Sequence, residues 1–128
     1  MSFFLCKMLV NLKNAQKSKN SFMIHRKTSL CSQVLNILWD ANLILGYKVN
    51  NKNQNYLVIF LKYNQNEPVI TKLENISLPS RRVYLSVKEI WKLDSNLGLF
   101  IFATNKGVLS SKCCKRLNIG GELLAFVN

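Results

Sequence analysis

The chain has 128 residues, which suffices for one compact domain or two small subdomains that share a core. Hydrophobic residues make up 48% of it, so its composition is not that of a disordered chain. The net charge of +12 favours a polyanionic partner, with nucleic acid ahead of a membrane surface, and a generally soluble cationic surface as the plain alternative.

The residues of metal and redox chemistry show no recognisable spacing. The four cysteines, which include the adjacent pair Cys113 and Cys114, form no Cys-x-x-Cys motif. No zinc site or secreted disulfide framework is therefore expected, and free thiols in a reducing compartment are predicted. We expect no metal and no cofactor.

Catalytic chemistry is not expected either. The six acidic residues are scattered, and His25, the only histidine, has no neighbouring partner for a triad or a metal site. His25 is predicted to be a strand-edge residue. The chain is predicted not to be an enzyme, and neither a small-molecule substrate nor a membrane is expected as its partner. The apolar start at residues 3–6 ends at Lys7, far short of the roughly 20 residues of a membrane span.

Two helices are predicted in the first half of the chain. Apolar residues recur at helical spacing from residue 5 to residue 12, and a polar loop is expected over 14–20. A second helix is predicted over 30–45, with Thr28 or Ser29 as its N-cap and Gly46 as its stop signal.

Strands fill the rest of this half. Short strands are predicted at 22–24 and 47–49, and a very apolar strand at 56–63 is expected to be central. A turn at 64–68 leads to a further strand over 69–76. This α-β-α-β-β order, with helices on one face of a small sheet, predicts an α+β fold.

A break is predicted around Pro79, because proline biases the residue before it to an extended conformation. It divides the chain into a subdomain of residues 1–78 and a mostly β subdomain of residues 79–128 that contains short helices. In the second part we expect a strand over 81–88 and a short helical turn at 90–93.

The C-terminal run from residue 98 carries the candidate site. An apolar strand enters a polar loop closed by Gly107, and a basic helix over 111–117 and a Gly120-Gly121 turn precede the last strand. Hydroxyl, amide and ammonium groups on tight turns can bond phosphate oxygens and 2′-hydroxyls. The expected groups are those of Thr104, Asn105 and Lys106, with Gly107 allowing a close backbone approach.

Two motifs in this run resemble the ribosomal protein S8 (uS8) family. Residues 103–109 read Ala-Thr-Asn-Lys-Gly-Val-Leu, against the family's Ser-Thr-Ser-Lys-Gly-Val-Met, and 118–124 read Asn-Ile-Gly-Gly-Glu-Leu-Leu, against Asn-Val-Gly-Gly-Glu-Val-Leu. Residues 77–84 and 8–15 are similar to two further family segments. The resemblance implies a structural protein of the small ribosomal subunit that binds the central domain of small-subunit rRNA, supports assembly and translation, and contacts neighbouring ribosomal proteins. A basic nucleic-acid-binding protein outside the ribosome is the alternative.

The resemblance and the charge pattern extend the predicted RNA-binding set. Glu122 is read either as a salt bridge or cap within its turn, or, by the resemblance, as an acceptor for a base amine or an organiser of the loop. The complete predicted set is Thr104, Asn105, Lys106, Gly107, Gly120, Gly121, Glu122, Arg82, Tyr84, Lys112, Arg116, Lys27, Ser29 and Lys13.

The compartment is predicted from composition alone. Asn, Lys and Ile are abundant and glycine and proline are scarce, with 5 and 2 residues, as in AT-biased organelle genes. This pattern favours a mitochondrial small ribosomal subunit in the matrix, with a plastid or the bacterial cytoplasm as the alternative.

Overall fold

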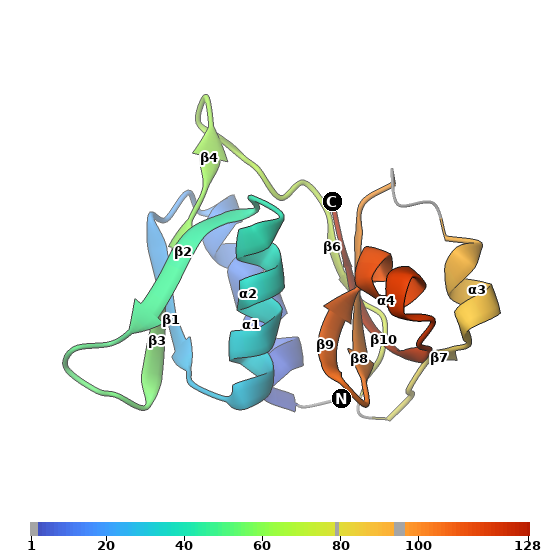
Figure 1. Cartoon of the computed structure of the whole chain (residues 1–128). Helices are drawn as coiled ribbons and strands as arrows, with labels where there is room; N and C mark the ends of the chain where they lie inside the picture. Colours follow the sequence, from blue (N-terminus) through green and yellow to red (C-terminus); the bar gives the residue numbers. More distant parts are fainter. Residues whose placement is uncertain (1–2, 79, 94–96) are drawn as a thin grey trace.

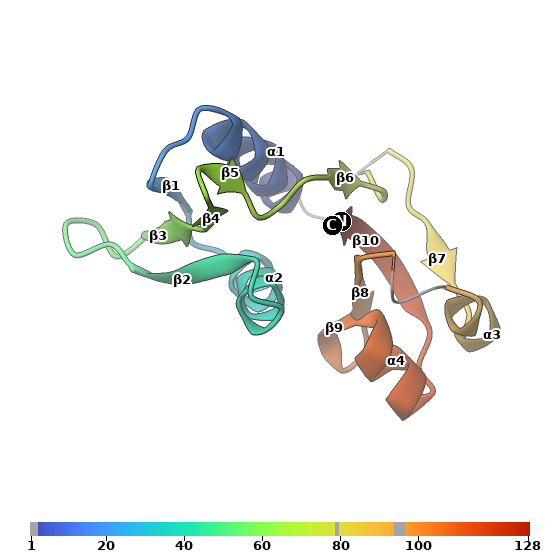
Figure 2. The same cartoon turned by 90° about the horizontal axis from the view of Figure 1, so that it is seen from above.

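The computed structural model of the chain describes residues 3–78, 80–93 and 97–128, with the side chains of residues 3 and 4 left aside. Its first half contains two helices and a three-stranded antiparallel sheet of order β1-β3-β2. The elements are α1 (Phe3–Lys17), β1 (Phe22–Arg26), α2 (Ser29–Asp40), β2 (Ile44–Val49) and β3 (Tyr56–Leu61). Both helices lie on the same face of this sheet (Figures 1 and 2).

Helix α1 confirms the apolar pattern seen in the sequence. Leu5, Met8, Leu9 and Leu12 have no exposed surface, because their spacing puts them on one face of the helix. The helix continues to Lys17, so the loop expected over residues 14–20 is shorter than predicted.

Helix α2 begins as predicted but ends early. The hydroxyl of Thr28 caps it by accepting a hydrogen bond from the Cys31 N–H. The helix ends at Asp40, not at Leu45, because Asn42 adopts a left-handed φ of 61° and turns the chain into β2. Gly46 is therefore not a helix stop; it lies at a register irregularity within β2.

Strand β3 is central, as predicted, since it pairs with β1 and β2. It leads into the hairpin of β4 (Tyr63–Asn64) and β5 (Glu67–Pro68). The expected turn is confirmed, with positive φ angles at Gln65 and Asn66. His25 lies on the edge strand β1 and is buried on the face that the helices cover.

The second half forms a five-stranded sheet of order β6-β10-β8-β9, with β7 also paired to β10. Its strands are β6 (Leu73–Asn75), β7 (Tyr84–Leu85), β8 (Leu99–Thr104), β9 (Gly107–Ser110) and β10 (Gly121–Val127). The strand expected over 69–76 is thus shorter and pairs with β10 instead of the first sheet. The division at residues 78 and 79 stays a prediction, and β6 belongs by pairing to the second sheet.

Helix α3 (Val87–Trp91) starts earlier than the helical turn expected at 90–93 and takes the last two positions of the strand expected over 81–88. Within that range the strand β7 covers only Tyr84 and Leu85. Ser86 and Glu89 form a capping box in which each side chain bonds the other residue's backbone N–H. This cap starts the helix directly after β7. Pro79, on which the predicted break depends, lies outside the described residues.

The main hydrophobic core joins both halves of the chain. It packs side chains of α1, α2 and the first sheet against Ile101 of β8 and Leu124 and Val127 of β10. A smaller cluster around Phe102, Ile90 and Cys114 lies between the second sheet and helices α3 and α4 (Ser111–Leu117). The helices α1 and α2 therefore lie between the two sheets (Figure 2), and the α+β class is confirmed.

Candidate nucleic-acid interface

The predicted polar loop is the tight turn of a β-hairpin. Strands β8 and β9 pair antiparallel, and Thr104 and Gly107 close the turn. The Thr104 hydroxyl donates a hydrogen bond to the Gly107 carbonyl at 2.8 Å and accepts one from the Lys106 N–H at 3.2 Å. The side chains of Asn105 and Lys106 at its tip are exposed. Thr104 therefore holds the turn, while Asn105 and Lys106 present it to solvent.

The backbone conformation at Gly107 requires a glycine. Its φ of 109° lies in the region that side chains disfavour, whereas an added Cβ would be in ordinary contact with the Gln33 side-chain oxygen at 3.4 Å. The tight turn predicted at Gly107 is thus present, and the predicted close approach of its backbone to RNA stays a prediction.

The second predicted turn is built differently from the expectation. The residue that reverses the chain is Asn118, which follows α4 with a left-handed φ of 55° and donates its N–H to carbonyls of the last helical turn. Gly120 and Gly121 instead allow close packing, since a Cβ on Gly121 would lie 2.5 Å from the Ala103 carbonyl oxygen. The Gly-Gly pair thus lets β10 enter between β7 and β8.

These two bends enclose an open depression of about 480 Å³, which we call the hairpin hollow. It brings together most of the residues predicted in the C-terminal run and adds Asn118, which sequence reasoning did not select. The lining residues are Tyr84, Ala103, Thr104, Asn105, Lys106, Asn118, Ile119, Gly120, Gly121 and Glu122.

Two predicted residues, Tyr84 and Glu122, form one rim of the hairpin hollow, and Arg82, which is not part of its lining, interacts with both. Tyr84 pairs with Glu122 across β7 and β10. The Tyr84 hydroxyl, by a hydrogen bond, and more weakly the Glu122 carboxylate raise the pKa of the Arg82 guanidinium. Glu122 is buried, whereas Tyr84 is 63% exposed. The rim thus offers an open aromatic ring, with the Arg82 cation next to it.

A buried serine fixes this rim to the sheet. Ser77 has no exposed surface, donates a hydrogen bond to the Leu123 carbonyl at 2.6 Å and accepts one from the Val83 N–H at 3.0 Å. It joins the segment that leads to Tyr84 to the strand that carries Glu122. Only its position in the family-like segment 77–84 marked it in the sequence.

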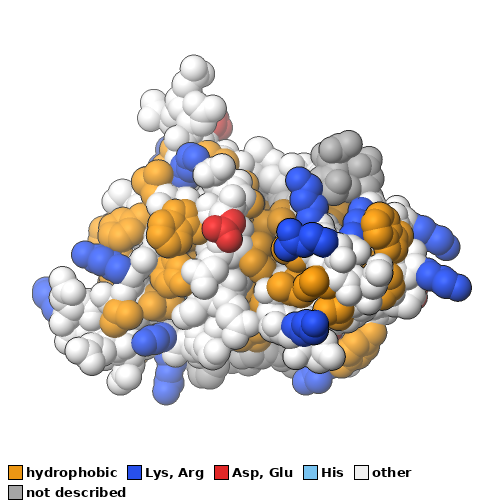
Figure 3. Space-filling model, viewed as in Figure 1, with side chains coloured by type: hydrophobic (Ala, Val, Ile, Leu, Met, Phe, Trp, Pro, Cys, Tyr) orange, Lys and Arg blue, Asp and Glu red, His pale blue; other side chains and the backbone are white. Residues whose placement is uncertain are grey.

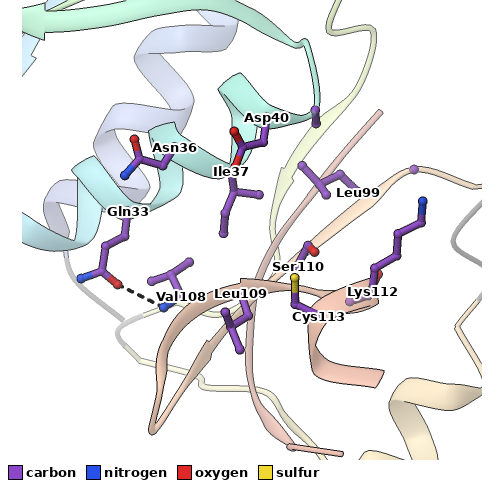
Figure 4. Close-up of a pocket in the computed structure, with 13 residues that line it drawn as sticks. Gln33, Asn36, Ile37, Asp40, Leu99, Val108, Leu109, Ser110, Lys112 and Cys113 are labelled. Atoms are coloured by element: carbon purple, nitrogen blue, oxygen red, sulfur yellow. Dashed lines mark hydrogen bonds between the residues drawn. The ribbon is translucent and has the colours of Figure 1, made fainter. Parts of the chain in front are cut away.

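Gln33 of α2 is a positioning residue that the sequence did not reveal. Its side-chain oxygen accepts a hydrogen bond from the Val108 N–H of β9 at 3.1 Å (Figure 4). Its Nε2 donates to the Ser29 hydroxyl at 3.2 Å. This amide connects the beginning of α2 to the β8–β9 hairpin across a cleft also lined by Asp40 and Lys112.

The remaining predicted residues lie outside the hairpin hollow. Ser29 and Lys27 are exposed at the start of α2, where the Lys27 N–H bonds the Asn55 carbonyl. Lys112 and Arg116 are exposed on α4. Lys13 lies on α1, beside a separate small depression between that helix and residues 68–73. Ser110 is the residue before α4, but its side chain makes no capping bond.

The part of the chain that the structure describes gives little support for a metal site, a disulfide or a membrane-spanning helix. No group of three or more histidine, cysteine or acidic side chains there is arranged to hold a metal ion. The cysteines among the described residues are free thiols, and burial raises the pKa of Cys31 and Cys114. None of the described helices is long and apolar enough to cross a membrane.

Comparison with known proteins decides the family. The model of the family described as ribosomal protein S8 matches residues 4–128. The chain belongs to the ribosomal protein S8 family. It is 35% identical over 123 residues to the small ribosomal subunit protein uS8 of Pseudomonas fluorescens, covering 96% of this chain and 95% of the relative. It is 37% identical over 125 residues to the uS8 of Caulobacter vibrioides, with the same coverage.

A third S8 relative, from Wigglesworthia glossinidia brevipalpis, is 32% identical over 120 residues, covering 94% of this chain and 92% of the relative. These S8 proteins carry the name of a ribosomal constituent, not of an enzyme. Family membership therefore confirms the prediction that the chain is not an enzyme.

Proposed function

We propose that this S8-family chain is a structural constituent of the small ribosomal subunit. It binds directly to the central domain of small-subunit rRNA, supports subunit assembly and translation, and contacts neighbouring small-subunit proteins. The family match supports the ribosomal role, since its relatives are named small ribosomal subunit protein uS8.

The observation that carries the proposal is the hairpin hollow. Exposed Asn105, Lys106, Tyr84 and Asn118 line it together, and Thr104 holds the turn that carries the first two. Amide and ammonium donors on a fixed backbone suit phosphate oxygens and 2′-hydroxyls, and an open tyrosine ring suits a base. The net charge of +12 adds long-range attraction to a polyanion.

Residues outside the hollow widen the proposed contact. Lys27 and Ser29 lie at the start of α2, which Gln33 ties to the hairpin, and Lys112 and Arg116 add charge on α4. Lys13 would touch RNA at a separate place, because it lies on α1. Figure 3 shows Lys and Arg side chains spread over both halves of one face, with few acidic side chains among them.

The compartment belongs to the proposal as well. AT-biased composition favours the mitochondrial small subunit, whereas the relatives described above are bacterial and support the alternative of a bacterial cytoplasm. Co-sedimentation of the tagged protein with small subunits from purified organelles or from bacterial cytosol separates the two.

A binding comparison tests the RNA partner. The dissociation constants of the protein for a bulged rRNA helix of the central domain and for a DNA duplex of equal charge are measured over a range of salt concentrations. We expect tighter binding of the RNA at every salt concentration, because shape and hydrogen bonds add to charge. Equal affinities that fall in parallel with salt would favour a general basic nucleic-acid-binding protein outside the ribosome.

A further inference from the structure

The outer face of the first sheet, opposite α1 and α2, is open to solvent. Alternation along β1 sends Met23 and His25 toward the helices and leaves Phe22 and Ile24 48% and 50% exposed. In Figures 1 and 2 this face points away from the second half of the chain. Two large apolar side chains are thus left uncovered by the fold.

Strand register collects these residues into rows. Phe22 lies directly opposite Phe60, and Ile24 lies opposite Val58, which in turn is opposite Lys48 on β2. Residues that face each other across paired strands share one face of the sheet. The two phenylalanine rings therefore lie on neighbouring strands of one surface.

This surface is hollowed and has a basic, amide-bearing rim. A depression of about 310 Å³ has apolar side chains as its floor and the β2–β3 turn as its rim; its lining residues are Phe22, Lys48, Asn50, Asn51, Lys52, Val58 and Phe60. The Lys48 ammonium lies 5.8 Å from the centre of the Phe60 ring. The Asn50 side chain accepts the Lys52 N–H at 3.0 Å, which orders the turn.

The charge on this face has a single sign. Its charged side chains are Arg26, Lys48 and Lys52, and the one acidic residue between positions 22 and 61 is Asp40, at the end of α2. Aromatic floors beside cations are the features by which proteins hold unpaired nucleotides, with bases on the rings and phosphates on the cations. An apolar protein partner would explain the phenylalanines but not the uniformly basic rim.

We propose that the outer face of the first sheet is a second RNA contact, which takes unpaired nucleotides. Bases stack on Phe22 and Phe60, and the neighbouring phosphates lie beside Lys48 and Lys52. The inference rests on the proposed function only in taking RNA as the partner, since it uses no residue of the hairpin hollow.

Fluorescence anisotropy of a labelled short oligouridylate tests this contact on the full chain. An abasic ribose-phosphate strand of the same length is the matched probe, because it has the same charge and no base. Phe22→Leu and the double variant with Phe60→Leu remove the rings and keep apolar side chains. Trp91→Leu, at an exposed ring on α3, is the control variant, and thermal unfolding checks that each variant is folded.

We expect the wild type to bind the oligouridylate more tightly than the abasic strand. We expect Phe22→Leu to weaken oligouridylate binding about fivefold to tenfold, while binding of the abasic strand and the behaviour of Trp91→Leu stay unchanged. Equal affinity of the wild type for both strands, or an unchanged affinity of the folded double variant, would overturn the proposal. Either result would assign the face to a protein partner or a second copy of the chain.

The bulged rRNA helix, measured in parallel, separates this inference from the proposed function. If the wild type binds that helix in preference to DNA but shows no preference for a base-bearing strand, only the second contact is rejected. If the wild type binds that helix no better than DNA but prefers the base-bearing strand to the abasic strand, the proposed function fails and the second contact stands.

Discussion

The side-chain oxygen of Gln33 accepts the backbone N–H of Val108 at 3.1 Å, and this bond connects the helix α2 to the edge strand β9. The two residues are 75 positions apart in the chain. Because Val108 follows the β8–β9 turn directly, the bond also fixes how the hairpin stands against the first half of the molecule.

Replacing Gln33 tests this connection. In Gln33→Leu the Val108 amide loses its acceptor, so we expect its hydrogen exchange to accelerate and the free energy of unfolding to fall by about 1 kcal/mol. Amide exchange followed by NMR measures both. Ser29→Ala is the control, since it removes the other bond of the same side chain and should leave exchange of the Val108 amide unchanged.

Thr104 is expected to act through the shape of the turn. Thr104→Val removes the hydroxyl that both donates to Gly107 and accepts from Lys106, so the Lys106 amide should exchange faster and rRNA affinity should fall at every salt concentration. Thr104→Ser keeps the hydroxyl and should retain most of the affinity. If the valine variant exchanges and binds as the wild type does, the hydroxyl does not hold the turn.

Asn105 is expected to act directly on the RNA. Its exposed side chain makes none of the bonds within the turn, so Asn105→Ala should weaken binding of the bulged rRNA helix while leaving the melting temperature unchanged. Loss of one hydrogen bond to RNA corresponds to about a tenfold rise in the dissociation constant. Titration at several salt concentrations and thermal unfolding measure the two effects. An unchanged dissociation constant would contradict a direct contact.

Lys106 should contribute mainly through charge. Lys106→Ala should weaken rRNA binding and reduce the slope of log affinity against log salt by about one unit, because one phosphate contact is lost. Lys19→Ala, at an exposed lysine beyond the end of α1, serves as a control of equal charge change. A slope as steep as that of the wild type would mean that Lys106 does not touch a phosphate.

Gly121 is expected to be required for the packing of β10. In Gly121→Ala the new Cβ would lie 2.5 Å from the Ala103 carbonyl oxygen, so the β8–β10 pairing must shift. We expect a loss of about 1–3 kcal/mol in the free energy of unfolding, measured by urea denaturation. Asn118→Gly, in which glycine can keep the left-handed conformation of residue 118, should reduce the free energy of unfolding much less. Equal losses in the two variants would argue against a steric role for Gly121.

The sequence predicts those parts of the fold that depend on local patterns. The buried face of α1 and the central strand β3 follow from spacing and apolarity alone. The end of α2 could not be predicted in this way, because apolar residues continue to Leu45 while Asn42 turns the chain. The start of α3 could have been found, since Ser86 and Glu89 have the spacing of a capping box.

The candidate site shows the same limit. The motif around residues 104–107 predicts a polar turn, and the motif around residues 118–122 predicts that a second bend lies near it. Which atoms hold these bends depends on distant partners: Gln33 on α2 and the buried hydroxyl of Ser77. The pairing of β6 with β10 likewise joins segments about fifty residues apart, and no local pattern encodes it.

Photo-crosslinking from position 105 tests the central claim most directly. A photoreactive amino acid replaces Asn105 in the tagged protein, which is then incorporated into small ribosomal subunits and irradiated. We expect crosslinks to the central domain of small-subunit rRNA, because the hairpin tip is exposed beside the hollow. Crosslinks from this position to protein alone, in subunits that contain the chain, would contradict the account.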